Sequence, residues 1–354
     1  MSDAGAAFTG TKPVEARHEL DEARLLPWLR EHVDGFEGPL EVRQFRGGQS
    51  NPTYELITPG GRYVLRRKPP GKLLPSAHAV DREFRVISAL WPTGFPVARP
   101  YALCEDDAVI GTAFYVMEKV EGRIFWDGRL PELGFEERGA VYRAEIETLA
   151  RLHGIDPQGV GLGDYGKAGN YFARQVDRWS KQYRASETRA LPAMDRLIES
   201  LPQSLPEDDA VSIVHGDYRL DNLIIDAEAP RVAAVLDWEL STLGNPLADF
   251  SYFLMQWVMP AEQRGGLAGM DVKAHGLPTM NEAVEQYAAA TGRAGVPELD
   301  WYFAYNLFRL AAICQGIAGR VRDGTAASAH AQAMAERVEP LAEAAWSFAR
   351  KAGA

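Results

Sequence analysis

Cysteine is almost absent from this sequence of 354 residues, which contains only Cys104 and Cys314. The two lie far apart and lack the close spacing of metal ligands, so the sequence predicts neither a disulfide framework nor a zinc site. Long hydrophobic runs are also missing. The most apolar stretch, residues 250–259 (FSYFLMQWVM), is interrupted by polar residues and is much shorter than the about 18 apolar residues that a membrane span requires. We interpret it as a buried helix and expect no membrane association.

Positively charged residues are also fewer than negatively charged ones. The chain has 38 Lys and Arg against 49 Asp and Glu, which gives a net charge of −11. A general nucleic-acid binder has the opposite balance, so we expect no nucleic-acid partner. The first residues lack the basic and apolar regions of a secretory signal peptide, and together with the low cysteine content this favours a cytoplasmic protein.

The composition is otherwise that of a globular protein, with 46% hydrophobic and 25% charged residues, which excludes a disordered or collagen-like chain. At about 100 to 200 residues per domain, the length predicts two domains or one unit of two lobes. We expect a loose tail over residues 1–24, an N-terminal lobe over 25–120 and a C-terminal lobe over 121–354.

The N-terminal lobe is predicted to be rich in strands. A short amphipathic helix is predicted over 25–33, strands within 41–58 and over 61–68, and a further strand within 109–122. A Pro-Gly-Gly turn at 59–61 separates the first strands, and apolar residues spaced by three or four predict a helix over 80–90.

The C-terminal lobe reads as mainly helical. One long helix is predicted within 134–156, and two short strand-like runs interrupt the pattern at 211–226 and 231–241. Further helices are predicted over 249–259, 280–291, 299–321 and 326–350, with Trp301, Tyr305 and Phe308 as core residues. The fold class is therefore predicted as α+β, with a small antiparallel-sheet N-lobe and a larger helical C-lobe.

The strongest chemical signal is the sequence HGDYRLDN at residues 215–222. Asp217 and Asn222 stand five residues apart in it, and Asp237 follows fifteen residues later at the end of another apolar run. Phosphoryl transfer from a nucleotide to a hydroxyl requires a carboxylate near the acceptor proton and oxygen ligands for Mg²⁺. The two loops would supply one base and two ligands. Alternatively, residues 217–222 form a plain turn rich in Asp and Asn between two strands.

These motifs carry a family resemblance. HGDxxxxN followed by LDWE resembles the catalytic and metal-binding loops of the aminoglycoside phosphotransferase and choline kinase family, which shares its bilobal fold with protein kinases. More narrowly, FRGGQSNPTYEL, YVLRRKPPG, HGDYRLDNLI and VLDWELSTLGNPLADFSYF are similar to the kinase-like domain found beside acyl-CoA dehydrogenase domains. The resemblance covers roughly residues 40–325 and implies a kinase that uses ATP or GTP with Mg²⁺.

The resemblance also implies roles for single residues. Asp217 corresponds to the catalytic base, and Asn222 and Asp237 to the two Mg²⁺ ligands. His215 is expected to orient the loop through hydrogen bonds, and Asp249 to support the loop and to cap a helix.

The residues that bind the phosphates of the nucleotide are predicted in the N-terminal lobe. Gly47, Gly48, Ser50 and Asn51 form a candidate phosphate-covering loop, although a plain hairpin turn is the alternative and the protein-kinase GxGxxG pattern is absent. Residues 41–72 contain seven Lys and Arg against two Asp and Glu. This local excess of positive charge lies where the phosphates of a nucleotide are expected.

Arg66 stands at the position of the kinase lysine, and it can bind two phosphate oxygens at once. Glu83 on the following helix is expected to pair with Arg66; a solvated helix face is the alternative. Met117 and Glu118 precede the segment between the lobes and are adenine-site candidates through their backbone. A methionine at a strand end is, however, more often a core residue.

We therefore predict a Mg²⁺-dependent ATP or GTP phosphotransferase that acts on a hydroxyl of a small molecule, with a hydroxyacyl or other metabolic compound as one acceptor class. The alternatives are a non-catalytic nucleotide-binding module and an aminoglycoside-modifying kinase. A metallophosphoesterase is disfavoured because no histidine cluster is present. Asn306, Arg309 and Arg320 are candidates for the acceptor pocket, His153 is expected to be a packed or capping residue, and the sequence leaves a monomer and a homodimer open.

Overall fold

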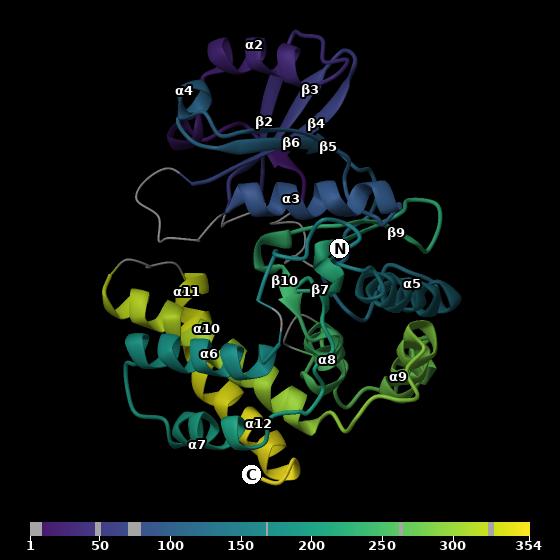
Figure 1. Cartoon of the computed structure of the whole chain (residues 1–354), viewed down its shortest axis with the longest axis vertical. Coiled ribbons are helices and arrows are strands. Elements are labelled where there is room, and N and C mark those ends of the chain that lie inside the picture. Colours follow the sequence, from purple (N-terminus) through teal and green to yellow (C-terminus); the bar gives the residue numbers. More distant parts are fainter. Residues whose placement is uncertain (1–8, 47–50, 70–78, 168, 262–264, 325–328) are drawn as a thin grey trace.

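The computed structural model describes residues 9–46, 51–69, 79–167, 169–261, 265–324 and 329–354. These residues form a smaller part built on a six-stranded antiparallel sheet and a larger part that is mainly helical (Figure 1). The α+β class and the two-part arrangement predicted from the sequence are confirmed. Because the chain passes between the parts after the last strand of the sheet, residues from both can meet where the parts face each other.

The sheet belongs entirely to the first third of the chain. Its spatial order is β1-β2-β3-β4-β6-β5, so β4 lies in the interior between β3 and β6. The strands are β1 (Thr11–Lys12), β2 (Glu41–Phe45), β3 (Thr53–Thr58), β4 (Gly61–Arg67), β5 (Pro100–Cys104) and β6 (Phe114–Glu118). In the register of β4 with β6, Arg66 lies opposite Tyr115. This register places Arg66 at the end of β4 that faces the helical part.

The described part of the expected N-terminal tail is structured. Thr11–Lys12 pair with β2. Helix α2 (Glu22–His32) begins three residues before the predicted helix, because the Asp21 side chain accepts a hydrogen bond from the backbone N–H of Arg24 and so satisfies an otherwise unpaired helix-end donor. Residues 1–8 lie outside the described residues.

Helices cover both faces of the sheet. α2 and the short α4 (Asp107–Ile110) lie on one face, and α3 (Val80–Leu90) lies on the other, between the sheet and the helical part (Figure 1). The buried face of α3 includes Val80, Ile87 and Leu90, as the apolar spacing predicted, and it also includes the charged residue Glu83. A carboxylate on a buried helix face requires partners, and these are described below.

The helical part is organised around a long helix, α10, which packs against α6, α8, α11 and α12. Trp301, Tyr305 and Phe308 on α10 are buried core residues, as predicted. The helices of this part are α5 (Phe135–His153), α6 (Tyr171–Ser186), α7 (Pro192–Ser200), α8 (Pro246–Val258), α9 (Met280–Thr291), α10 (Asp300–Arg322), α11 (Ala329–Glu336) and α12 (Val338–Lys351). Among the described helices, none is long and apolar enough to cross a lipid bilayer.

The single helix predicted over 326–350 is wrong. The structure has two helices, α11 and α12, with the break at Arg337. Pro340 explains the break, since it has no N–H to donate to the carbonyl of Glu336 four residues earlier and its ring clashes with that carbonyl. Helices α6 and α7 were not predicted individually.

Two small two-stranded antiparallel sheets lie where the helical part faces α3. β7 (Ser212–Val214) pairs with β10 (Thr242–Gly244), and β8 (Leu223–Ile225) pairs with β9 (Val232–Val235). The segment 215–222 connects β7 to β8, and Asp237 follows β9. The two motifs identified in the sequence are therefore neighbours at the ends of these strands.

Candidate active site

His215 joins the two motifs to each other. Its ring is fully buried, and its Nε2 lies 2.8 Å from the carbonyl oxygen of Leu236, while the backbone N–H of Asp217 donates to its Nδ1 over 3.2 Å. One ring nitrogen therefore donates to the loop after β9, and the other accepts from the loop after β7, which defines the tautomer. The orienting role predicted for His215 is confirmed.

Asp249 binds the backbone at the start of the loop that contains Asp217. Its two carboxylate oxygens accept hydrogen bonds from the backbone N–H groups of His215 and Gly216, at 2.5 and 2.8 Å. Burial alone would raise the pKa of Asp249, but the hydrogen bond and charge of His153 and these loop donors lower it. The supporting role is confirmed. The predicted capping role is wrong, because α8 begins earlier and Asn245 caps it.

His153 completes this support. Its Nε2 lies 3.5 Å from a carboxylate oxygen of Asp249, and its Nδ1 forms a 2.6 Å hydrogen bond with the hydroxyl of Tyr287. The packed role expected for His153 is confirmed.

Gly216 is required by the path of the loop. Its φ is +84°, and a Cβ at this position would lie 2.7 Å from the carbonyl oxygen of Leu240. Any other residue would combine a left-handed backbone conformation with a steric clash. This geometry explains why a glycine precedes Asp217 in the motif.

The carboxylate of Asp217 is held by donors on both oxygens. Oδ2 accepts a 3.1 Å hydrogen bond from Asn222 Nδ2 and lies 3.3 Å from Arg219 Nε, and Oδ1 accepts a 2.7 Å hydrogen bond from the hydroxyl of Tyr252. The side chain of Asp217 remains 23% exposed, so a substrate can still reach it. Sequence reasoning did not identify Tyr252, which lies 35 residues away on α8.

Arg219 is a second contact that sequence reasoning missed. Its Nε lies 3.2 Å from Asp221 Oδ1 as well as beside Asp217. Burial raises the pKa of Asp221, and the Arg219 guanidinium partly offsets the rise. Because Arg219 lies within HGDYRLDN, its position in the motif was the available signal.

Asn222 and Asp237 fit the requirements of a Mg²⁺ site. The backbone N–H of Leu236 donates to the carbonyl of Asn222, so the two ligand candidates lie on adjacent strand ends. Asp237 is 43% exposed and adopts a left-handed conformation with φ of +63°, which costs on the order of 1 kcal/mol or more for a residue other than glycine. Their amide and carboxylate oxygens are the hard donors that Mg²⁺ prefers.

Arg66 reaches this position from the sheet. Its guanidinium pairs with Glu83 on α3 and with Asp237, each at 2.8 Å, and Glu239 lies 3.7 Å away. The predicted pairing of Arg66 with Glu83 is therefore present. The contact with Asp237 is unexpected and connects the sheet part directly to the helical part.

Glu83 is almost fully buried and has two further donors. Asn51 Nδ2 donates to one carboxylate oxygen over 2.9 Å, and the Tyr115 hydroxyl donates to the other over 3.1 Å. Burial raises the pKa of Glu83 to about 7, although the Arg66 guanidinium opposes the rise.

This geometry changes the expected role of Asn51, which is fully buried and orients Glu83 instead of facing a phosphate. The other members of the predicted phosphate-covering loop, Gly47, Gly48 and Ser50, lie outside the described residues. The local positive charge of residues 41–72 is also largely paired: Arg62 pairs with Glu55 and Glu121, and Lys68 pairs with Asp81.

The adenine candidates lie at the end of β6. Met117 pairs with Val64 across the sheet and packs partly on the main core. The backbone N–H of Glu118 donates to the carbonyl of Arg99 over 2.8 Å. That N–H therefore already has a partner in the backbone of the protein.

The three acceptor-pocket candidates have different surroundings. Arg309 is buried and donates a 2.5 Å hydrogen bond to the carbonyl of Gly216. Asn306 is fully buried and donates to Ser251; it lies within the helix packing, which corrects its expected place in the pocket. Arg320 is exposed near the end of α10. Of the three, only Arg309 contacts the loop that contains Asp217.

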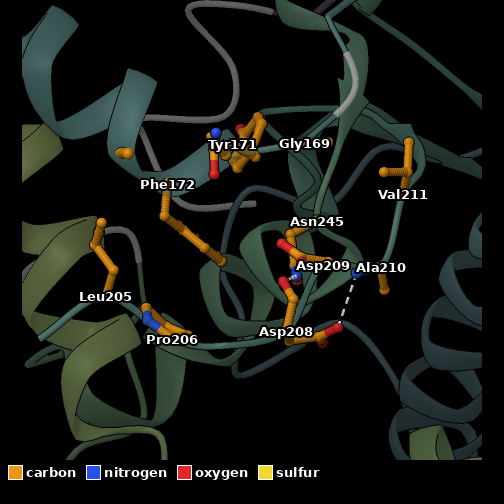
Figure 2. Close-up of a pocket in the computed structure, with 13 residues that line it drawn as sticks. Gly169, Tyr171, Phe172, Leu205, Pro206, Asp208, Asp209, Ala210, Val211 and Asn245 are labelled. Carbon is orange, nitrogen blue, oxygen red and sulfur yellow. Dashed lines mark hydrogen bonds between the residues drawn. The ribbon is translucent and has the colours of Figure 1, made fainter.

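A separate cavity of about 100 Å³ lies between the N-terminus of α6 and the loop before β7 (Figure 2). Tyr171, Phe172, Asp208 and Asn245 line it, and Asp208 accepts a hydrogen bond from the backbone N–H of Ala210. Its lining does not include Arg66, Glu83, Asp217, Asn222 or Asp237. The cavity is therefore not part of the candidate active site.

The comparisons with known proteins agree with this geometry. Residues 41–302 match the model of the phosphotransferase enzyme family. The chain belongs to this family. The matched segment contains Arg66, Glu83, Asp217, Asn222 and Asp237, so a single family unit includes both parts of the candidate site.

Curated relatives of this phosphotransferase family chain are longer proteins. Acyl-CoA dehydrogenase family member 10 of Mus musculus is 44% identical over 97% of the chain, and acyl-CoA dehydrogenase family member 11 of Homo sapiens is 42% identical over 92%. The chain spans only 32% and 43% of their lengths. It is thus similar to less than half of each protein.

Solved structures show the same fold. A crystal structure from Ralstonia eutropha, described as a candidate aminoglycoside phosphotransferase, is 50% identical with a TM-score of 0.87, covering 94% of this chain and 99% of that one. An aminoglycoside phosphotransferase in complex with AMP-PNP and hygromycin B has a TM-score of 0.60 at 15% identity and covers 94% of this chain and 99% of that one. The second likeness supports the fold alone.

Proposed function

We propose that this protein is a Mg²⁺-dependent phosphotransferase that transfers the terminal phosphoryl group of ATP or GTP to a hydroxyl of a small molecule. One observation carries the proposal: Asp217, Asn222, Asp237 and Arg66 come from three separate segments, and hydrogen bonds and ion pairs, one of them through the backbone of Leu236, join them at the junction of the two parts. Phosphoryl transfer depends mostly on positioning and on charge neutralisation, and this set of residues supplies both.

Each residue has a distinct role in the proposed reaction. Asp217 accepts or orients the proton of the acceptor hydroxyl. Arg66, held by Glu83, binds phosphate oxygens with its forked guanidinium. Mg²⁺, when bound through Asn222 and Asp237, supplies neutralisation of the phosphate charge. In this structure Arg66 pairs with Oδ1 of Asp237.

The charge around Asp217 bears on the choice of acceptor. Arg219 lies beside the carboxylate, and Arg309 contacts the same loop and lies over the rings of Tyr252 and Trp179. These cations disfavour a polycationic aminoglycoside, for which an acidic pocket is expected. They favour a neutral or anionic metabolic acceptor, such as a hydroxyacyl compound, in agreement with relatives named as acyl-CoA dehydrogenase family members.

The proposal also includes the arrangement of the chain. Residues 25–120 would form the nucleotide-binding lobe and residues 121–354 the lobe with the catalytic loop and acceptor site. Both cysteines are free and buried, in keeping with the reducing cytoplasm that we propose as its location. The oligomeric state, monomer or homodimer, is a separate quantity to be measured.

The central test replaces the base. Asp217→Asn should lower phosphoryl transfer by about 10²- to 10⁴-fold, the usual contribution of a general base, while Mg²⁺·ATP still binds. Turnover is followed as Mg²⁺-dependent ATP consumption with a panel of hydroxyl compounds, and binding by calorimetry. Asp226→Asn, an acidic residue that follows β8 and is not at the site, is the control. Unchanged turnover in Asp217→Asn would overturn the assignment.

The alternative is a nucleotide-binding module without catalysis, and the same measurements distinguish it. Such a module binds nucleotide but consumes none with any acceptor, and Asp237→Ala then changes binding alone. For an enzyme, Asp237→Ala removes both the metal dependence and the turnover.

A further inference from the structure

Helix α8 presents two polar residues to the loop that contains Asp217. Asp249 holds the backbone at the start of the loop, and Tyr252, one helical turn later on the same face, donates its hydroxyl to Asp217 Oδ1 over 2.7 Å. One rigid element therefore determines both the position of the loop backbone and the orientation of its carboxylate.

The contact from Tyr252 differs from the other two contacts of this carboxylate. Asn222 and Arg219 both approach Oδ2 and both belong to the loop itself. Oδ1 has Tyr252 as its donor among the described residues. The χ2 angle of an aspartate has broad energy wells, so the carboxylate rotates easily about the Cβ–Cγ bond. Without Tyr252, only the contacts of Oδ2 with Asn222 and Arg219 would limit this rotation.

Tyr252 is itself in contact with a second helix. The Arg309 guanidinium on α10 lies 5.2 Å from the centre of the Tyr252 ring and donates to the carbonyl of Gly216, directly before Asp217. A cation at this distance from an aromatic face is attracted to it. Burial, and secondly the charge of Asp217, raises the pKa of Tyr252 above its ordinary value, so its hydroxyl keeps the proton that it donates.

We propose that Tyr252 is a positioning residue for phosphoryl transfer: its hydroxyl, held in place by Arg309, fixes Asp217 so that one lone pair of Oδ1 points at the incoming acceptor hydroxyl. This inference rests on the proposed function. It predicts that the Tyr252 hydroxyl acts on the rate of transfer and not on nucleotide binding, because its hydrogen bond goes to Asp217 and, in the described part of the chain, Arg66, Glu83 and Asp237 have other partners.

The test uses Tyr252→Phe in the full chain, with Mg²⁺·ATP as donor and water as acceptor, since hydrolysis needs no identified substrate. The expected result is a kcat about 10- to 100-fold lower, the usual effect of losing a hydrogen bond to a charged group, with KM for ATP within about twofold of the wild type. Tyr54→Phe is the control, because Tyr54 is a buried tyrosine that also donates one hydrogen bond, of 2.8 Å, to the carbonyl of His18 in the sheet part. It should leave kcat unchanged.

A double variant separates positioning from general stability. In an Asp217→Asn background, Tyr252→Phe should cause no further loss of rate, because the carboxylate that it orients is gone. Thermal unfolding of each variant shows whether the protein remains folded.

The results of these experiments distinguish the inference about Tyr252 from the proposed function. If the wild type hydrolyses ATP and Tyr252→Phe does so equally fast, or if the two losses are independent, the inference is wrong and the proposed function stands. If the wild type binds ATP but turns over with neither water nor any hydroxyl compound, the proposed function is wrong and the inference is overturned with it.

Discussion

The two parts of the candidate site hold their essential residues by different means. In the helical part, backbone amides fix the loop around Asp217, because the buried carboxylate of Asp249 binds two consecutive N–H groups and Arg309 binds the next carbonyl. In the sheet part, the Arg66 side chain is held by ion pairs with other side chains, those of Glu83, Asp237 and Glu239.

The difference corresponds to what each residue would do in the proposed reaction. A base must keep one position, and hydrogen bonds to the backbone of a packed loop provide it. A phosphate-binding cation has to exchange partners when the nucleotide and metal arrive, and an ion pair to a partly exposed carboxylate can be exchanged at small cost. We therefore expect changes in the helical part to affect folding and catalysis together, whereas changes in the sheet part should affect nucleotide binding first.

The largest effect is expected from Asp249→Asn. This change removes the charge that holds two buried N–H groups and that lies beside His153, so the free energy of unfolding should fall by about 3–5 kcal/mol, the usual result of breaking a buried charged contact. Urea unfolding measures the loss, and ATP consumption should disappear with it. Asp34→Asn, at an exposed position, is the matched control and should be neutral. A loss below about 1 kcal/mol would contradict the view that this carboxylate fixes the loop.

A smaller effect on folding is expected from Arg66→Met. Glu83 would lose its cation, but it would keep the donors Asn51 and Tyr115 and, with a pKa raised to about 7, could take up a proton. We expect a loss of about 2–3 kcal/mol in the free energy of unfolding and a loss of measurable ATP binding by calorimetry.

The double variant Arg66→Met with Glu83→Met sharpens this expectation. Apolar residues in place of a buried ion pair are often neutral or stabilising, so stability should return towards the wild type while ATP binding stays lost. If ATP binding returned as well, the pair would be structural and the assignment of Arg66 to the phosphates would be wrong.

The smallest effect is expected on the pH dependence of the free energy of unfolding. The pKa of Asp249 is lower in the folded protein than its ordinary value, so its contribution to stability is complete above the unfolded pKa of about 3.9 and is lost as the pH falls through the folded pKa. The difference in unfolding free energy between wild type and Asp249→Asn should therefore be constant from about pH 5 to 7 and shrink below about pH 4. Urea unfolding at these pH values measures it, and a difference that grows on acidification would contradict the sign.

The sequence predicted the local elements of the site because each has a short-range pattern. The apolar spacing of α3 located Glu83, and the strand before HGD and the apolar run before Asp237 placed the two loops. Tyr252 and the supporting role of Arg309 could not be predicted in the same way. Both lie on helices whose buried faces look like ordinary core in the sequence, and only the packing of α8 and α10 shows which of those side chains reach the loop.

Even within the motifs, long-range contacts changed individual roles. Asn51 appeared to be a phosphate donor from its place beside the glycines, but the fold buries it against Glu83. Asp249 appeared to cap α8, but Asn245 begins the helix four residues earlier.

The sequence by itself determined the fold class and the family and named Asp217, Asn222 and Asp237 as candidates, because these depend on hydrophobic periodicity and on motifs with fixed spacing. The tertiary structure alone decided how the charges are distributed among partners. It showed that Arg66 bridges Glu83 and Asp237 and that Tyr252 holds Asp217. The physical reason is that a charged side chain inside a protein takes whichever partners the packing of distant segments provides, and no local pattern records that choice.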